Sequence, residues 1–396
     1  MKRQGIAILG ATGSIGRSSL EVIRHNPDRY QVVALSGNQQ VKTLAEQANE
    51  FAPLLLAVGL GKGNELKSLL KKGYDPEILE GQPGLLAVAR CGEANQVIAA
   101  LVGACGIEPV LAALKAKKRV NLANKEAIVM AGPLVMQTAK ENGAEILPVD
   151  SEHNAIFQAL QGSKRQDLDH VILTASGGPF RNRAKAEFNQ ITKEEALKHP
   201  NWDMGAKITI DSATMMNKAL EVIEAKWLFD LHPSQIKVVV HPQSILHSAV
   251  AYQDGSLVAQ LGTPNMQVPI AYCLAWPHRI TSGVKPLDLA SQGKLEFFAP
   301  DFEKFESLGF AFDALHLGGG APAALNAANE ELVAQFLQGG IGFHEIFTYL
   351  RQLMDELKQL RQGRADFPFA MNQFSDALQA DQWGRRFVQQ ALQGAA

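Results

Sequence analysis

The residues best suited to chemistry in this chain of 396 residues are two carboxylates separated by one serine, Asp150-Ser151-Glu152. An apolar run over residues 145–149 predicts a buried strand before them, and a helical pattern follows them. We therefore expect Asp150 at the end of a strand and Ser151 as the N-cap of a helix. Two carboxylates at such a point can bind one divalent cation. Acidic residues at a helix start can also merely complement the helix dipole, and this stretch alone leaves both interpretations open.

A glycine-rich turn lies between an apolar segment at residues 6–9 and a helical pattern at residues 18–24. Glycines at such a turn let a pyrophosphate approach the backbone, and the helix N-terminus attracts its charge. The turn predicts a dinucleotide site, and a purely structural tight turn is the alternative. Its residues are Gly10, Ala11, Thr12, Gly13, Ser14, Ile15 and Gly16.

The next predicted strand, residues 31–35, is followed by Ser36-Gly37-Asn38-Gln39 without an acidic residue. An acid at this place would bind the ribose 2′-hydroxyl of NAD. Its absence favours NADP(H).

Lys125 follows another predicted strand, residues 120–122, and stands between Asn124 and Glu126. Strand ends of a parallel sheet meet at one edge, so Lys125 is expected near the glycine turn and Asp150. There it could hold a ribose hydroxyl, a substrate oxygen or a phosphate. The alternative is a solvent-facing Lys–Glu pair of little energetic value.

Two later segments could bind an anion. The loop Ser176-Gly177-Gly178 follows a predicted strand at residues 171–174, and its amides and hydroxyl can surround an anion. In the second segment Ser212 is expected to cap a helix that runs to about Phe229. Asn217, Lys218 and Glu221 share one face of that helix, which could hold a phosphate and a cation. A solvated side of an amphipathic helix is the alternative.

A loop rich in unusual residues, His199-Pro200-Asn201-Trp202-Asp203-Met204-Gly205, separates a predicted helix at 192–198 from a predicted strand at 207–210. Trp202 has no periodic reason to lie in a core. A mobile lid that excludes water from a substrate is one interpretation. A loop whose tryptophan packs on its own domain is the other.

The elements that must position these residues indicate an α/β protein. Strands alternate with helices in the first third of the chain, which predicts a parallel sheet. Residues 236–260 are typical of an antiparallel sheet with a hairpin at Asp254-Gly255, and His241 there is expected to satisfy core hydrogen bonds. The last hundred residues show helical periodicity over 323–337, 343–360 and 374–392. We expect an N-terminal Rossmann-like NADPH-binding domain at 1–149, a central α+β catalytic and metal domain at 150–285 with a lid around 195–206, a connecting arm at 286–300, and a C-terminal helical bundle at 301–396.

The composition excludes several classes of partner. A net charge of -2 gives no reason to expect nucleic acid or an anionic membrane. Cys91, Cys105 and Cys273 are far apart and suggest no disulfide framework, so a cytoplasmic location is expected. No apolar stretch is long enough to cross a bilayer.

Taken together, these motifs resemble the 1-deoxy-D-xylulose 5-phosphate reductoisomerase family, NADPH-dependent enzymes of the non-mevalonate isoprenoid pathway. Each motif is unspecific by itself, but their order is highly specific and spans nearly the whole chain. The segments that carry the resemblance are 10–16, 122–126, 148–154, 176–180, 199–202, 211–218, 241–244 and 326–330.

The resemblance implies a site for each ligand and a role for each residue. A divalent cation (Mg²⁺, Mn²⁺ or Co²⁺) would be held by Asp150, Glu152 and Glu221, which with Lys125 form the catalytic group. The sugar phosphate would contact Lys125, Ser151, Glu152, Ser176, His199, Trp202, Ser212, Asn217, Lys218 and Glu221. NADPH would lie on Thr12, Gly13, Ser14, Ile15, Gly37, Asn38, Asn124, Glu126 and Gly205.

The implied reaction is a cation-dependent rearrangement of 1-deoxy-D-xylulose 5-phosphate, followed by reduction to 2-C-methyl-D-erythritol 4-phosphate. Glu152 and Lys125 are the candidates for proton transfer. The resemblance also implies a homodimer, with the central domain at 150–285 as its dimerisation domain. The chain departs from the family at Gly37-Asn38, where a basic residue often stands.

Two other functions are compatible with parts of the sequence. One is a metal-free NADP-dependent dehydrogenase of the semialdehyde type, which would need a nucleophilic cysteine. The other is a non-catalytic NADPH sensor that binds partners through its helical tail. The three carboxylates and the phosphate-binding serines argue against a sensor.

Overall fold

The chain forms two compact units, each described here by itself. The computed structural model describes residues 3–200, 202, 204–363 and 367–394. The first unit comprises Met1–Ala127, Val135–Asn154 and Asn265–Pro286, and the second comprises Ile128–Leu134, Ala155–Pro264 and Leu287–Ala396. None of the helices in the described ranges has the length and apolar character that crossing a membrane requires.

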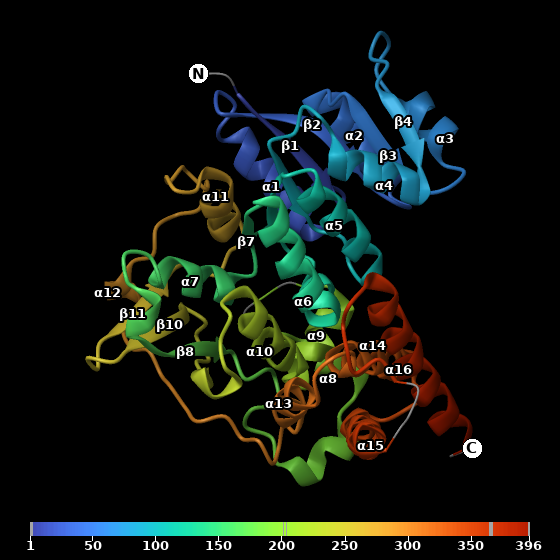
Figure 1. Ribbon diagram of the computed structural model, residues 1–396. Coiled ribbons are helices and arrows are strands. Elements are labelled where there is room, and N and C mark those ends of the chain that lie inside the picture. Colours follow the sequence, from blue (N-terminus) through green and yellow to red (C-terminus); the bar gives the residue numbers. More distant parts are fainter. Residues whose placement is uncertain (1–2, 201, 203, 364–366, 395–396) are drawn as a thin grey trace. The chain divides into compact units, whose positions relative to one another are not determined.

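A seven-stranded parallel sheet forms the centre of the first unit (Figure 1). Its order is β4-β3-β2-β1-β5-β6-β7, and its inner strands are buried along almost their whole length. Such burial is typical of a parallel sheet covered on both faces, so the predicted Rossmann-like sheet is confirmed. The strands are β1 (Gln4–Leu9), β2 (Tyr30–Ser36), β3 (Leu55–Val58), β4 (Glu77–Glu80), β5 (Gln96–Ala99), β6 (Arg119–Leu122) and β7 (Ile146–Pro148).

The strand order of this sheet reverses at β1, which pairs with β2 on one side and β5 on the other. Ligands of open α/β sheets bind outside the carboxyl ends of the strands at such a point. The helices around the sheet are α1 (Ser14–Arg24), α2 (Val41–Phe51), α3 (Gly63–Leu69), α4 (Gly81–Arg90), α5 (Ile107–Lys115), α6 (Lys125–Asn142) and α11 (Gln267–Ala275), with a 3₁₀ turn η1 (Ala104–Gly106).

The second unit contains a four-stranded sheet in the order β11-β10-β8-β9. β8 (Leu168–Ala175) pairs with β9 (Ile236–Val240) in parallel and with β10 (Leu246–Tyr252) antiparallel. β10 and β11 (Leu257–Leu261) form the hairpin predicted at Asp254-Gly255, which is confirmed.

The helices of the second unit include one that the sequence analysis described wrongly. Residues 207–210 were predicted to be a strand, but they lie in α9 (Ala206–Ala213). A short apolar run fits a strand or a helix equally well. In the structure Ile210 and Ala213 are buried at helical spacing. Ser212 is therefore not an N-cap: it lies near the end of α9. The next helix, α10 (Met216–Leu228), begins after Met215, whose φ is +62°.

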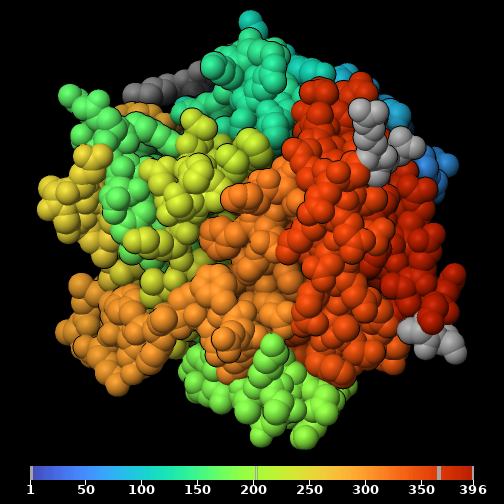
Figure 2. Space-filling view, turned by 60° about the horizontal axis from the view of Figure 1, so that its bottom comes forward, coloured from blue at the N-terminus to red at the C-terminus, as the bar shows by residue number. Residues whose placement is uncertain are grey.

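Four helices form the predicted C-terminal bundle, which is confirmed, and they occupy the orange-to-red surface in Figure 2. An aromatic cluster joins this bundle to the segment that follows β8. The ring centroid of Phe343 lies 5.1 Å from the ring centroid of Phe180 and 5.5 Å from that of Phe188. The helices are α13 (Ser307–Leu317), α14 (Ala321–Gln338), α15 (Phe343–Gln362) and α16 (Phe374–Gly394).

Shorter elements complete the second unit. α7 (Ser151–Ala159) begins in the first unit and continues into the second. The remaining elements are α8 (Lys193–Ala196), α12 (Leu289–Gln292), η2 (Arg165–Asp167), η3 (Lys185–Gln190) and η4 (Pro233–Gln235).

Candidate functional site

Asp150 stands where the sequence analysis expected it, between the end of β7 and the start of α7. The predicted cap is wrong in one respect. Helix α7 begins at Ser151 itself, and the Asp150 carboxylate accepts the backbone N–H of Glu152 at 3.3 Å. Asp150 thus takes the capping role, since Asp is as good an N-cap as Ser. The Ser151 hydroxyl instead donates to the Glu152 carboxylate at 2.6 Å.

Lys125 forms an ion pair with Asp150, with 2.8 Å between Nζ and Oδ2. The two side chains are only 14% and 24% exposed, so the solvent-facing Lys–Glu pair considered above is wrong. Burial opposes the ionisation of Asp150, but the charge of Lys125 and the hydrogen bonds to the carboxylate outweigh it. They hold the pKa of Asp150 far below its usual range. This end of the sheet therefore presents a carboxylate that stays charged.

Two buried residues that were not predicted as site residues fix the end of β7. The Asn154 side chain donates to the carbonyl of Pro148 at 2.9 Å and to the sulfur of Cys273 at 3.2 Å. The Cys273 thiol also donates to Pro148, and its burial raises the pKa of the thiol. A protonated, hydrogen-bonded thiol is a poor nucleophile, which argues against Cys273 as the nucleophile that a semialdehyde-type dehydrogenase needs.

The glycine turn after β1 has the shape that a pyrophosphate needs. Gly10 has a φ of +84°, and a Cβ at this position would lie 2.5 Å from the carbonyl oxygen of Ala100. Helix α1 begins at Ser14, earlier than predicted, and its N-cap Gly13 contributes no side-chain hydrogen bond. The first amides of α1 therefore remain available to an anion, so these residues fit a dinucleotide.

Gly37, after β2, lies against this turn. A Cβ at Gly37 would approach the methyl group of Thr12 to 3.1 Å, which is tighter than most real contacts. Asn38 follows and is exposed. Thr12 and Gly37 thus lie together at the carboxyl edge of the sheet, as expected for two neighbouring parallel strands.

Asn124, also predicted to contact the cofactor, is buried and organises the loop after β5. Its amide donates to the carbonyls of Leu101 at 2.9 Å and Gly103 at 3.2 Å, and to the Glu126 carboxylate at 2.7 Å. The loop it holds adjoins the glycine turn through Ala100. Asn124 and Glu126 thus shape the edge of the predicted dinucleotide cradle.

The second unit gathers Ser176, His199 and Ser212. The Ser176 hydroxyl oxygen accepts the N–H of Gly178 at 3.2 Å and lies 3.1 Å from Nε2 of His199. Gly178 has a φ of +66°, and a Cβ there would lie 2.6 Å from the carbonyl oxygen of Ser212. Only glycine allows the Ser176 loop to approach α9 this closely.

His199 also anchors the loop that was predicted to be a lid. The backbone N–H of Trp202 donates to Nδ1 of His199 at 2.9 Å. A neutral ring then carries its proton on Nε2 and donates it toward Ser176. Burial lowers the pKa of His199, which favours this neutral form. The predicted residues Asn201 and Asp203 lie outside the described residues.

The polar face of α10 is buried, so the solvated alternative is wrong. Lys218 and Glu221 are 3% and 1% exposed and form an ion pair. The Asn217 amide donates to the other Glu221 oxygen at 2.6 Å. The side-chain carbonyl oxygen of Asn217 is buried, and no hydrogen-bond partner for it appears in the described part of the chain. Buried charges are costly and often mark functional sites.

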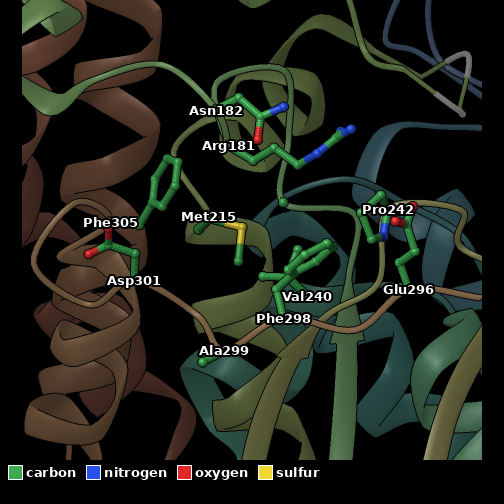
Figure 3. Close-up of a pocket in the computed structure, with 11 residues that line it drawn as sticks. Arg181, Asn182, Met215, Val240, Pro242, Glu296, Phe298, Ala299, Asp301 and Phe305 are labelled. Carbon is green, nitrogen blue, oxygen red and sulfur yellow. The ribbon is translucent and has the colours of Figure 1, made fainter.

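A cavity of about 380 Å³ lies in the second unit beside Gly177 and Met215. Figure 3 shows Met215, Val240 and Phe298 together, with Arg181 and Asn182 on a neighbouring loop. Of the predicted anion-binding loop only Gly177 is among the described residues that line it, and the side chains predicted to bind a ligand are not.

His241, next to this cavity, has the structural role that was predicted. It is fully buried, its Nδ1 lies 2.8 Å from the carbonyl oxygen of Glu296, and its Nε2 accepts the N–H of Ile245. It thereby attaches the arm to the end of β9.

The predicted residues thus fall into two groups, one in each unit. The first unit carries Asp150, Ser151, Glu152 and Lys125 with the dinucleotide cradle, and the second carries Ser176, His199, Trp202, Gly205, Ser212, Asn217, Lys218 and Glu221. Sequence reasoning missed the buried residues Asn154, Cys273, Asp211 and Asn329 that support them. Asn154, Asp211 and Asn329 lay inside recognised motifs but were given no role there, and Cys273 lay outside every motif.

The comparison with known proteins covers the same span as the motifs. Family models match residues 6–132 (1-deoxy-D-xylulose 5-phosphate reductoisomerase), 146–229 (1-deoxy-D-xylulose 5-phosphate reductoisomerase C-terminal domain) and 261–387 (DXP reductoisomerase C-terminal domain). The 1-deoxy-D-xylulose 5-phosphate reductoisomerase of Cupriavidus necator is 53% identical over 366 residues, 91% of this chain and 92% of the relative. That of Geobacter metallireducens is 49% identical over 380 residues, 96% and 97% of the two chains.

Solved structures agree with these relatives. DOX-P reductoisomerase in complex with NADPH, fosmidomycin and magnesium is 45% identical, covers 98% of both chains and superposes with a TM-score of 0.92. The enzyme from Zymomonas mobilis in complex with NADPH is 40% identical, covers 99% of both chains and has a TM-score of 0.91. The resemblance seen in the motifs is confirmed: the chain belongs to the 1-deoxy-D-xylulose 5-phosphate reductoisomerase family.

Proposed function

We propose that this chain catalyses the cation-dependent rearrangement of 1-deoxy-D-xylulose 5-phosphate and its reduction by NADPH to 2-C-methyl-D-erythritol 4-phosphate, a step in isoprenoid precursor biosynthesis. The observation that carries the proposal is the full-length similarity to an enzyme of this name that was solved with NADPH and magnesium. The chemistry of the two groups of residues supports it.

NADPH is proposed to bind at the edge of the parallel sheet. The amides of Ser14 and Ile15 at the start of α1 would hold its pyrophosphate, beside Thr12 and Gly13. Gly37 and Asn38 would hold the adenosine ribose. No acidic residue at this point repels a 2′-phosphate, which favours NADPH over NADH. Asn124, Glu126 and Gly205 complete the proposed contacts.

The proposed ligands of the cation are Asp150 and Glu152 of the first unit and Glu221 of the second. Three carboxylates are hard oxygen donors of the kind that Mg²⁺, Mn²⁺ and Co²⁺ accept. Lys125 keeps the pKa of Asp150 far below its usual range, so Asp150 is charged and ready to bind a cation, and Glu221 lies beside Lys218. The cation would supply Lewis-acid stabilisation of negative charge on substrate oxygens.

The substrate phosphate is proposed to bind in the second unit. The hydroxyl groups of Ser176 and Ser212, the amide of Asn217 and the charge of Lys218 would hold it, with His199 and Trp202 closing from the lid. Lys218 and the N-terminus of α10 both favour an anion here.

Three residues of the first unit are proposed to handle the substrate hydroxyls and protons. Lys125 donates three N–H groups and lies beside Asp150, and Ser151 donates to Glu152. Lys125 and Ser151 would orient the hydroxyls, and Glu152 would accept and return the proton. Exclusion of water by the lid would protect the reactive carbonyl intermediate.

The quaternary structure and location are also proposals. A homodimer is supported by the exposed edge of the second sheet, where β11 presents Leu257 and Val258. A cytoplasmic location is supported by Cys91, Cys105 and Cys273, which form no disulfide in the described part of the chain.

The test is NADPH oxidation by the purified full chain with 1-deoxy-D-xylulose 5-phosphate, before and after EDTA, and after Mg²⁺ is restored. We expect turnover that EDTA abolishes and Mg²⁺ recovers. Turnover indifferent to EDTA would support a metal-free dehydrogenase instead. NADPH binding without any turnover would support a sensor.

A further inference from the structure

A buried amide on the C-terminal bundle reaches the helix that carries Ser212. Asn329 of α14 is fully buried, and its Nδ2 donates to Oδ1 of Asp211 at 2.7 Å. Asp211, on α9, is itself 2% exposed. The two residues are 118 positions apart in the sequence. Burying an amide and a carboxylate costs free energy unless they are hydrogen-bonded. Asn329 and Asp211 meet that requirement only while α14 and α9 keep their positions relative to each other.

The other oxygen of Asp211 faces its own helix. Oδ2 pairs with Nζ of Lys207, one turn earlier on α9, at 2.9 Å. The carboxylate is therefore held on one side by α14 and on the other by the start of α9. Asn329 supplies a hydrogen bond from outside α9.

Helix α9 connects two parts of the proposed site. Its N-cap is Gly205, where the lid segment ends, and the Thr209 hydroxyl donates to the Gly205 carbonyl at 2.9 Å. The residue directly after Asp211 is Ser212, onto whose carbonyl Gly178 packs. A rotation or shift of α9 would move the Ser212 hydroxyl and the lid together.

We propose that Asn329 is a positioning residue: by holding Asp211 it sets the position of α9, and with it the Ser212 hydroxyl and the C-terminal end of the lid. This role rests on the proposed function, because Ser212 is there a ligand of the substrate phosphate. The C-terminal bundle thereby contributes to substrate binding without touching the substrate.

The same helix offers a matched control. Asn326 is also fully buried on α14, one turn before Asn329. The side-chain carbonyl oxygens of both residues have no hydrogen-bond partner in the described part of the chain. Its amide donates to Glu330 at 3.1 Å, and Glu330 pairs with Arg385 of α16. The hydrogen bond of Asn326 thus lies within the bundle and does not reach α9.

The experiment compares Asn329→Ala with Asn326→Ala in the full-length enzyme. For Asn329→Ala we expect the KM for 1-deoxy-D-xylulose 5-phosphate to rise about tenfold or more, as for the loss of one hydrogen bond to a buried charge. The KM for NADPH should stay unchanged. Both variants should lower the melting temperature by a similar amount. Asn326→Ala should leave both KM values unchanged. Equal changes of substrate KM in the two variants would overturn the proposal.

An exchange of the two side chains keeps the test valid if Asn329→Ala folds poorly. Asn329→Asp alone would place two carboxylates against each other and should lose substrate affinity and stability. Adding Asp211→Asn restores an amide–carboxylate hydrogen bond and should recover part of the substrate KM. No recovery in a folded double variant would contradict the positioning role. If the unmodified enzyme does not turn over the substrate, the proposed function fails; if it does and the Asn329 variants behave like the Asn326 variant, only this inference fails.

Discussion

The buried pair of Lys218 and Glu221 on α10 gives the most informative substitution, Glu221→Gln. The change keeps the shape of the side chain and one acceptor oxygen, so the hydrogen bond from Asn217 at 2.6 Å can remain. It removes the charge that faces Lys218, which is only 3% exposed. If Glu221 binds the cation, the change also removes one of the three proposed ligands.

The expected cost in stability follows from this burial. Removing one partner of a buried ion pair typically costs about 3–5 kcal/mol, because the other charge stays buried and unpaired. The lower end, about 3 kcal/mol, is expected here because a buried lysine can release its proton. At roughly 2–4 °C per kcal/mol, the melting temperature should fall by about 6–12 °C. The double variant Lys218→Met/Glu221→Met should recover most of this loss, since it buries no charge.

The assay separates stability from cation binding. Mn²⁺ affinity, followed by electron paramagnetic resonance at a temperature where each variant is folded, should fall at least about tenfold in Glu221→Gln and also in the double variant. NADPH affinity should stay unchanged in both, because the dinucleotide cradle lies in the first unit. Unchanged Mn²⁺ affinity in folded Glu221→Gln would refute the ligand role. An equal loss of Mn²⁺ and NADPH affinity would show that Glu221 has been assigned to the wrong site.

Two further predictions concern the proposed lid and the proposed dinucleotide cradle. Because burial lowers the pKa of His199 below 6.5, its bond to the Trp202 amide stabilises the lid above pH 6.5 and is lost as the pH falls through that lowered pKa. The fluorescence difference between the wild type and Trp202→Phe should show that acid transition, and its absence would contradict the bond. A Cβ at Gly16 would lie 2.4 Å from a backbone oxygen, whereas one at Gly13 meets nothing closer than 3.4 Å. Gly16→Ala should thus cost roughly 1–3 kcal/mol of stability, while Gly13→Ala should keep its melting temperature; equal melting temperatures would be the contrary result.

Local patterns were enough to predict the parallel sheet and the candidate residues at its edge. The glycine turn, Lys125 and Asp150 each follow a short apolar strand, and the carboxyl ends of parallel strands share one edge. Their meeting, seen in the Lys125–Asp150 ion pair, therefore follows from the order of the elements.

Tertiary contacts decided what the sequence did not predict. Residues 207–210 are short and apolar, so they fit a strand or a helix equally well, and burial of α9 settles the choice. The face of α10 that carries Lys218 reads as solvated in isolation but is buried. The contact between Asp211 and Asn329 joins distant segments, which no local pattern reveals.

The most direct test of the central claim is the fate of the hydride. The full-length enzyme, Mg²⁺ and 1-deoxy-D-xylulose 5-phosphate would be incubated with NADPH that carries deuterium at the transferred position, and the product analysed by NMR and mass spectrometry. We predict 2-C-methyl-D-erythritol 4-phosphate with one deuterium on a carbinol carbon, and no product after EDTA treatment. An unbranched product, a product without deuterium, or the same product in EDTA would contradict the account.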